Sequence, residues 1–225
     1  MEHFDTKSKE LNKAGMGRGM LHYLSTLGGS APFMNPMTSR QLRITTSGWT
    51  GPISSLVGNS NRISRSRGMQ GSWFCVELAV FVIPSHYSLR HAWTSREGAL
   101  YSWNFLGSAD GKEWHVLREH YKDASLAKGG FSSHTWEIER GNVSTPCRFF
   151  KVQSTGPHIG TGDQYLTDHS DNPCVVRRRL RTNEGAGGGR HFLYCCGFEM
   201  YGEVTSPPPE FSLLDPKSIS DNWEI

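Results

Sequence analysis

The sequence predicts an all-β domain, and three observations carry this prediction. Short runs of alternating apolar and polar residues recur along the 225-residue chain, and a period of two is what a strand with one buried face requires. An Asp-Gly pair, Asp110-Gly111, joins two such runs and tolerates the positive φ of a tight hairpin. No long stretch has the 3.6-residue period of a helix, so we expect few helices.

Four strands are expected in the first half of the chain. Gly19–Leu24 is expected to be a first strand, and Gln41–Ser47 alternates as a half-buried edge strand does. Trp73–Val80 is expected to be the central strand, with 81–83 leading onward from it. In Pro84–His91 the apolar residues and the last histidine alternate with polar side chains.

The second half continues in the same way. Ala99–Gly107 carries large apolar residues at short spacing and is followed by the Asp-Gly turn. The remaining expected strands are Val116–His120, Ser133–Ile138, Arg148–Gln153 and Phe192–Val204. We expect four tryptophans of these runs to be buried in the core, namely Trp73, Trp103, Trp114 and Trp136.

Several runs, in this order, resemble the discoidin, or coagulation factor type C, superfamily. Residues 84–91 and 99–114 read P-x-H-Y-x-L-R-H and A-L-x-x-W-x-x-x-G-S-x-D-G-x-x-W, and L-R-E-H follows at 117–120. Residues 73–78 resemble its W-F-x-V-D-L strand with Glu77 in place of Asp, and 148–152 and 197–202 resemble R-Y-F-R-I and G-F-E-L-Y-G. The resemblance covers about Trp73–Val204 and is closest to the intracellular branch in HECT-type ubiquitin ligases and BTB/kelch-type proteins. It implies a galactose-binding-like jelly-roll β-sandwich.

The chain divides into three parts on this basis. Residues 1–18 form an N-terminal arm, which is either a docking arm or a loosely ordered leader. Residues 19–205 form the sandwich, and residues 163–190 are an insert that the superfamily pattern does not contain. Residues 206–225 form a Pro-rich linker and an apolar docking tail.

Composition excludes several classes of protein. The charged fraction is 20% and the net charge is +3, which favours neither a nucleic-acid-wrapping protein nor an acidic disordered tail. No window approaches the ~20 apolar residues of a membrane span. The first residues lack the apolar core of a signal peptide, so we expect a cytoplasmic protein, with a cytoskeletal or ciliary assembly as one setting. All five cysteines are expected to be reduced.

No residue pattern predicts catalysis or metal binding. His169, Cys174, His191, Cys195 and Cys196 lack the paired spacing of a zinc site, so we expect no metal. The glycine-rich run before Arg190 lacks the ending of a phosphate loop. No serine or cysteine lies in a triad-like motif, so the sequence predicts neither an enzyme nor a cofactor.

Binding is instead expected at loops at one end of the sandwich. The resemblance places these loops at Gly48–Gly71, His91–Gly98 and Gly156–Gly162. The contact residues we expect are Trp49, Arg90, Trp93, Arg96 and His158. Trp49 is either an anchor that folds back on the core or an exposed contact. Arg90 is either a contact or a structural residue that holds a loop.

The insert and the tail form a second group of expected partner contacts. Dense positive charge in the insert suits an acidic surface, and apolar residues after Pro209 exceed what a free terminus needs. These contact residues are Arg177, Arg178, Arg179 and Arg181 in the insert, and Phe211, Leu214 and Trp223 in the tail. Nucleic acid is an unfavoured partner because no aromatic stacking residues accompany a basic face.

The function predicted from these observations is a non-catalytic binding or scaffolding module that recognises a protein partner. We expect it to be a component of a larger intracellular assembly. The alternative is a glycan-binding module, in which Trp93 stacks on a sugar face with Arg96 and Asn104 as polar partners. A third hypothesis is a fixed structural component, because an arm, an insert and a tail with few internal contacts order on a neighbour.

Overall fold

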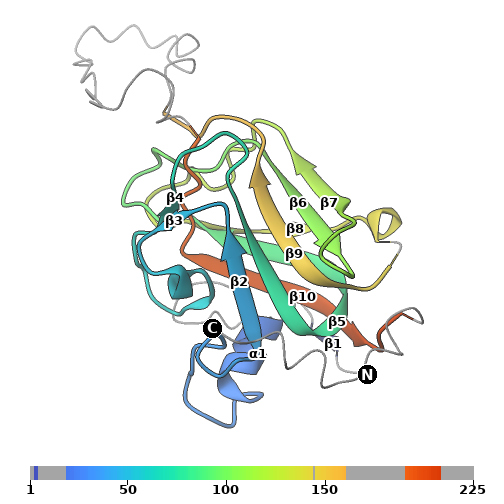
Figure 1. Ribbon diagram of the computed structural model, residues 1–225. Helices are drawn as coiled ribbons and strands as arrows, with labels where there is room; N and C mark the ends of the chain where they lie inside the picture. Colours follow the sequence, from blue (N-terminus) through green and yellow to red (C-terminus); the bar gives the residue numbers. More distant parts are fainter. Residues whose placement is uncertain (1–2, 5–18, 144, 161–190, 209–225) are drawn as a thin grey trace, which may run out of the picture.

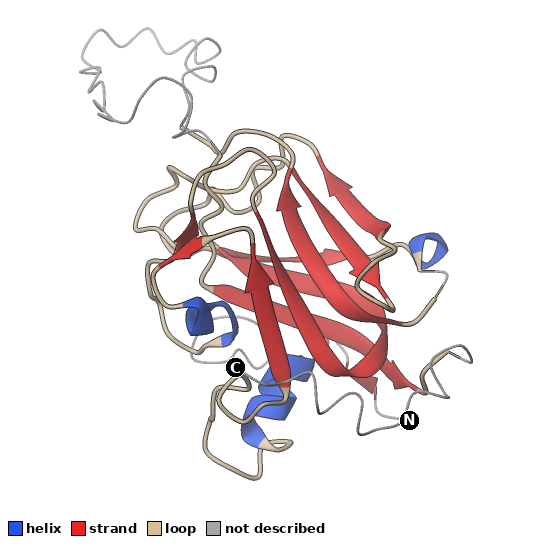
Figure 2. Cartoon of the chain, in the orientation of Figure 1, coloured by secondary structure: helices blue, strands red, loops and turns tan. Residues whose placement is uncertain are grey.

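A computed structural model describes residues 3–4, 19–143, 145–160 and 191–208. These residues form a jelly-roll β-sandwich of antiparallel strands, with short helices at its edges (Figure 1, Figure 2). The predicted all-β class is therefore confirmed. Most of the N-terminal arm, the insert and the tail lie outside the described residues.

The strands are β1 (His3–Phe4), β2 (Leu42–Thr46), β3 (Trp49–Thr50), β4 (Arg65–Ser66), β5 (Trp73–Arg90), β6 (Trp103–Ser108), β7 (His115–His120), β8 (Ser133–Glu137), β9 (Cys147–Ser154) and β10 (Gly197–Thr205). One α-helix, α1 (Met20–Thr26), and two 3-10 helices, η1 (Ile53–Val57) and η2 (Arg140–Asn142), complete the described elements.

The long strand β5 connects the two layers. Its first part pairs with β2 and β9, and its second part pairs with β10 and β8. The predicted strands at 73–80 and 84–91 are thus one continuous strand of 18 residues. The backbone passes very close to a neighbour at Gly202, where a Cβ would lie 2.2 Å from the Ile83 carbonyl oxygen and φ is +151°. A side chain at this position would block the pairing of β10 with β5.

Large aromatic side chains fill the space between the layers. Tyr87 stacks on Phe105 with ring centroids 3.9 Å apart, and Trp103 and Trp136 are buried as predicted. The prediction is wrong for Trp73 and Trp114, which are only half-buried. Their rings lie outside the core on either side of a lysine, with the Lys151 Nζ atom 5.4 Å and 3.5 Å from the two ring centroids. Cation–π contact therefore replaces core packing at these two positions.

The structure also corrects the predicted first strand, because residues 20–26 form helix α1. Both carboxylate oxygens of Glu199, on β10, accept hydrogen bonds from backbone N–H groups of its first turn. The distances are 2.7 Å from Leu21 N and 3.0 Å from His22 N. A helix leaves its first four N–H groups without internal partners, and an acid at that end is favourable. A distant side chain thus supplies the cap that the local sequence lacks.

The Asp-Gly hairpin is confirmed between β6 and β7. Asp110 Oδ1 accepts hydrogen bonds from the backbone N–H groups of Lys112 at 2.8 Å and Glu113 at 2.9 Å. Gly111 has φ +76°, the left-handed conformation that glycine adopts at little cost. The hairpin tip lies at the end of the sandwich opposite to residues 91–102 and 121–132, which leave from the other ends of β6 and β7.

Candidate binding surface at the loop end

Four connections leave the sandwich at the same end, which we call the loop end. They are residues 47–72 before β5, 91–102 between β5 and β6, 121–132 between β7 and β8, and 155–196 between β9 and β10. Antiparallel pairing places the ends of these strands together. Figure 1 shows the described parts of the last three connections above the sheets, whereas 47–72 also runs down the side of the sandwich, where η1 lies beside β2. The three loops expected from the sequence therefore lie at one end, and 121–132 is a fourth that the sequence did not indicate.

Backbone hydrogen bonds join these loops to one another. The Gly98 N–H donates to the Ile159 carbonyl at 2.8 Å, and the Ile159 N–H donates to the Ala99 carbonyl at 2.9 Å. The Phe131 N–H donates to the Trp93 carbonyl at 2.9 Å. The loop end is thus a connected surface and not a set of independent loops.

An aromatic cluster occupies the centre of this surface. It consists of Trp93, His158, Phe192 and Tyr194 together with the guanidinium of Arg65. Tyr194 contacts Trp93 with ring centroids 5.4 Å apart and Phe192 at 5.7 Å, and His158 stacks beside Phe192 at 6.2 Å. Trp93, His158 and Tyr194 are half-buried, so part of each ring faces solvent.

Arg65 joins the cluster from β4. Its guanidinium carbon lies 4.1 Å from the Phe192 ring centroid, and its Nη1 donates a hydrogen bond to the Tyr194 hydroxyl at 3.1 Å. A cation over an aromatic face is attracted by the ring quadrupole. The arginine therefore holds both rings in place while it remains half-buried.

Sequence reasoning identified Trp93 and His158 but missed Arg65, Phe192 and Tyr194. A signal for the last two exists in the run 192–195. Phe192 and Tyr194 alternate with the apolar residues Leu193 and Cys195, both of which are buried, so these two aromatic side chains share the other face of the chain, where Phe192 is buried and Tyr194 half-buried. Arg65 had no comparable signal, because its contacts lie about 130 residues further along the chain.

Trp49 and Arg90 both contact other parts of this domain. Trp49 folds back on the core, with its ring edge-on to Phe74 at 6.1 Å. Arg90 is 3% exposed, and its Nη1 donates to Asn61 Oδ1 at 2.9 Å. For Trp49 the structure therefore favours the anchor, and Arg90 holds the loop residue Asn61.

The loop end is basic. Its described segments contain six lysines and arginines and two acids, whereas the whole chain has a net charge of only +3. Arg62, Arg67 and Arg96 are exposed there, and Asp123, one of the two acids, is bonded to the interior. Asn104 lies apart from these loops in β6, paired with Glu119 and Gln153. Arg177, Arg178, Arg179, Arg181, Phe211, Leu214 and Trp223 lie outside the described residues.

A chain of Asp123, His120 and Tyr87 resembles a catalytic arrangement but lies inside the sandwich. His120 Nδ1 is 2.7 Å from Asp123 Oδ2, and its Nε2 is 2.6 Å from the Tyr87 hydroxyl. The Trp103 and Trp136 indole N–H groups donate to Tyr87 and Asp123. Neutral His120 satisfies every bond if Nδ1 carries the proton, and burial lowers its pKa to about 4. Tyr87 is fully buried, so this network holds the core together and is not open to a substrate.

The described residues contain no cluster of three or more His, Cys, Asp and Glu side chains that could hold a metal ion. Cys75, Cys147, Cys195 and Cys196 are free and buried, and Cys174 lies outside the described residues. Burial raises the pKa of these thiols, to about 12 for Cys75 and Cys195. No helix in the described residues has the length and apolar character needed to span a membrane.

Comparisons with known proteins agree with the fold and with the sequence resemblance. No protein-family model matches the chain. The E3 ubiquitin-protein ligase hecd-1 of Caenorhabditis elegans is 29% identical over 88% of this chain, which spans 7% of the ligase. A BTB/POZ domain-containing protein of Arabidopsis thaliana is 30% identical over 71% of this chain, which spans 21% of that protein.

Among solved structures, a carbohydrate-binding module of Clostridium perfringens (CBM32-3 from a family 31 glycoside hydrolase) has the same fold. It aligns with 73% of this chain and 93% of the module at a TM-score of 0.50 and 10% identity. The chain therefore has the galactose-binding-like jelly-roll fold, and its sequence is similar to a segment of HECT-type ubiquitin ligases and of a BTB/POZ protein.

Proposed function

We propose that this domain is a non-catalytic binding module that recognises a protein partner through its loop end, within a larger intracellular assembly. The observation that carries the proposal is the half-exposed aromatic cluster where four loops meet. Trp, Tyr and Arg dominate the residues that contribute most binding energy in protein interfaces. Trp93, Tyr194 and Arg65 supply all three types at one place.

The lengths of the relatives support a role within a larger protein. The chain spans less than a tenth of the ligase that it matches, so the matching segment there is one part among many. A compact sandwich that presents ordered loops suits recognition.

The extensions are assigned to the same assembly. We assign to partner contacts the arm of residues 1–18, of which His3–Phe4 pair with β10, and the linker and tail of residues 206–225, which would dock through Phe211, Leu214 and Trp223; the sandwich is residues 19–205. The arginines of the insert would contact an acidic surface, because four of them fall within five residues. The insert and the tail would thus add partner contacts to those of the loop end.

Affinity purification with mass spectrometry tests the proposal. Tagged wild-type chain is compared with the double variant Trp93→Ala/Tyr194→Ala and with Tyr23→Ala, a matched control whose aromatic ring is 38% exposed on α1. Circular dichroism first establishes that all three are folded. We expect the double variant to lose its partners and the control to retain them.

Two outcomes would contradict the proposal. The first is a partner set that the double variant retains in full. The second is sugar-specific binding on a glycan array that depends on Trp93, since this would establish the glycan-binding alternative.

A further inference from the structure

The buried guanidinium of Arg90 has no compensating negative charge in the described part of the chain. It donates a hydrogen bond to the neutral amide oxygen of Asn61, and its Nε atom has no hydrogen-bond partner. None of the ion pairs between described residues includes Arg90. A buried charge is costly unless it is paired.

The other arginine–acid contacts in the sheet show what compensation looks like. Glu77 Oε1 lies 2.6 Å from Arg148 Nη2, and Glu77 Oε2 lies 2.7 Å from Arg43 Nη2. Arg90 has two thiols near it, Cys195 and Cys196, where those arginines have a carboxylate. Its surroundings therefore lack the carboxylate that Arg43 and Arg148 share.

A shallow cleft opens beside this position. Asn61 lies between Ser60 and Arg62, and both of these residues line a cleft of about 280 Å³. Phe33, Asn35, Ser54 and Asn59 contribute further wall, and no acid lines it. The cleft thus offers a cation, amides and hydroxyls to a bound group, which suits an anion.

Residues 58–64, which carry Asn61, have no regular secondary structure. The Asn61 side chain can therefore leave Arg90 without breaking a strand or a helix. A carboxylate has the same shape as this amide and adds a negative charge, and arginine binds it through two parallel bonds. A carboxylate in the place of the Asn61 amide would therefore compensate the charge of Arg90.

We propose that the loop end binds an acidic segment of the protein partner, and that a carboxylate of this segment replaces the Asn61 amide on Arg90. This inference rests on the proposed function and names the chemistry of the partner. The excess of arginine and lysine over acids at the loop end would attract such a segment, and Arg62 would bind a second carboxylate in the cleft.

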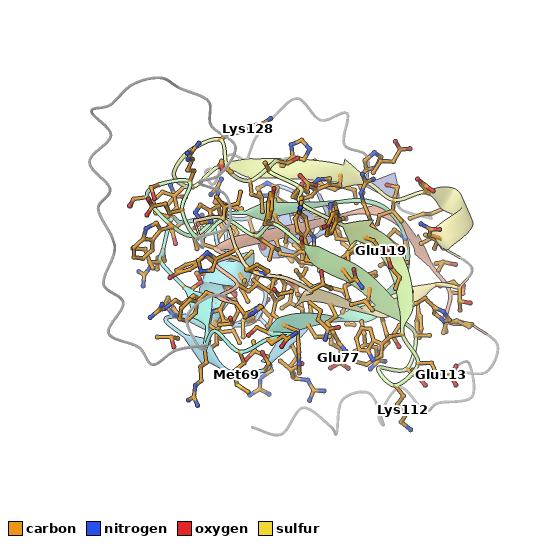
Figure 3. All side chains as sticks on the ribbon, turned by 90° about the horizontal axis from the view of Figure 1, so that it is seen from above. Met69, Glu77, Lys112, Glu113, Glu119 and Lys128 are labelled. Atoms are coloured by element: carbon orange, nitrogen blue, oxygen red, sulfur yellow. The ribbon has the colours of Figure 1, made fainter. Side chains whose placement is uncertain are left out.

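The test measures binding of a fluorescein-labelled hexaglutamate peptide to the full chain by fluorescence anisotropy. Asn61→Asp places a carboxylate on Arg90 within the chain itself, and Asn61→Ala removes the amide. Arg62→Glu reverses a charge in the cleft. Lys112→Glu is the matched control, because Lys112 lies at the hairpin tip, far from Lys128 of the loop end (Figure 3).

We expect Asn61→Asp to weaken peptide binding by about tenfold or more, the size that close charge pairs reach at interfaces. The same variant should raise the thermal midpoint of unfolding, because the new carboxylate neutralises Arg90. Asn61→Ala should bind the peptide as tightly as the wild type or more tightly. Arg62→Glu should weaken binding, and Lys112→Glu should leave it unchanged.

Three results would overturn the inference. The first is that the wild-type chain does not bind the peptide. This holds even if a chain that lacks residues 163–190 does bind it, because the insert would then supply the carboxylate to Arg90. Another is equal loss of binding in Arg62→Glu and Lys112→Glu. The third is that Asn61→Asp retains its partners in affinity purification while Trp93→Ala/Tyr194→Ala loses them. The proposed function would then stand, but the partner would not bind through an acidic segment.

Discussion

Acid should destabilise this domain through one buried histidine. His120 is 6% exposed and accepts a hydrogen bond from Tyr87 while it donates one to Asp123. Protonation would turn the accepting nitrogen into a donor facing a hydroxyl that already accepts from the Trp103 indole. Burial of the ring, which penalises its charged form, lowers the pKa of His120 from 6.5 to about 4 although Asp123 opposes the shift.

Proton linkage determines whether His120 makes the domain more or less stable as the pH falls. Between pH 6.5 and about 4 the unfolded chain binds a proton at His120 and the folded chain does not. The stabilisation is therefore complete above pH 6.5 and is lost as the pH falls toward 4. A difference of 2.5 pKa units corresponds to about 3 kcal/mol. Asp123 acts in the same direction, since hydrogen bonds from Ser125 and His120 outweigh its burial and lower its pKa.

Glu199 affects the pH dependence of stability in the opposite direction. Burial raises its pKa to about 8, so the folded state is stabilised while Glu199 is protonated, and this stabilisation is lost as the pH rises toward 8. The dependence of the wild-type unfolding free energy on pH therefore combines opposing contributions and does not isolate that of His120. Urea unfolding followed by tryptophan fluorescence from pH 4 to 7.5 should be compared for wild type, His120→Gln and His115→Gln. His115 is the control because it is an exposed histidine on the same strand.

We expect His115→Gln to follow the wild type. The gap in unfolding free energy between the wild type and His120→Gln should shrink by about 3 kcal/mol on going from pH 7 to pH 4. A gap that stays constant over this range would refute the reasoning, because His120 would then titrate alike in the folded and unfolded chains.

Three further predictions concern the interior. Trp103→Ala and Trp136→Ala should each lower the unfolding free energy by about 3–5 kcal/mol in urea titrations, whereas Trp73→Ala and Trp114→Ala should each cost less than about half as much; equal losses at all four positions would contradict the placement of the last two outside the core. Glu199→Ala should lower the unfolding free energy at pH 6 by about 1–3 kcal/mol, because the N–H groups of Leu21 and His22 would lose their acceptor; an unchanged value would argue against the cap. Iodoacetamide should leave Cys75, Cys147, Cys195 and Cys196 unmodified in the native chain at pH 7.5 and alkylate all of them in urea without reductant; rapid native labelling would show that these thiols are accessible.

Most strands could be predicted because their alternating pattern follows from one-sided burial. Leu42 and Ile44 point inward in β2, and Tyr87 and Leu89 do so in β5, as the pattern indicated. Helix α1 could not be found in this way. Its few apolar residues fit a strand equally well, and the carboxylate that caps it lies 178 residues away in the chain.

Two other errors have a similar origin. Trp73, Phe74, Cys75 and Val76 are all apolar, so the run does not show which side chains face the core. Pairing with β9 decides this, and it turns Trp73 outward toward Lys151. At the loop end, the aromatic cluster depends on contacts between β4 and the segment before β10, which no local pattern reveals.

The account depends most on the loop end being the binding surface, and hydrogen–deuterium exchange tests this directly. The chain is measured alone and with the partner recovered by affinity purification. We expect slower exchange on binding in residues 58–67, 91–98, 121–132, 155–160 and 191–196, and unchanged exchange in α1 and the β6–β7 hairpin. Protection confined to α1 or the hairpin, with the loops unchanged, would contradict it.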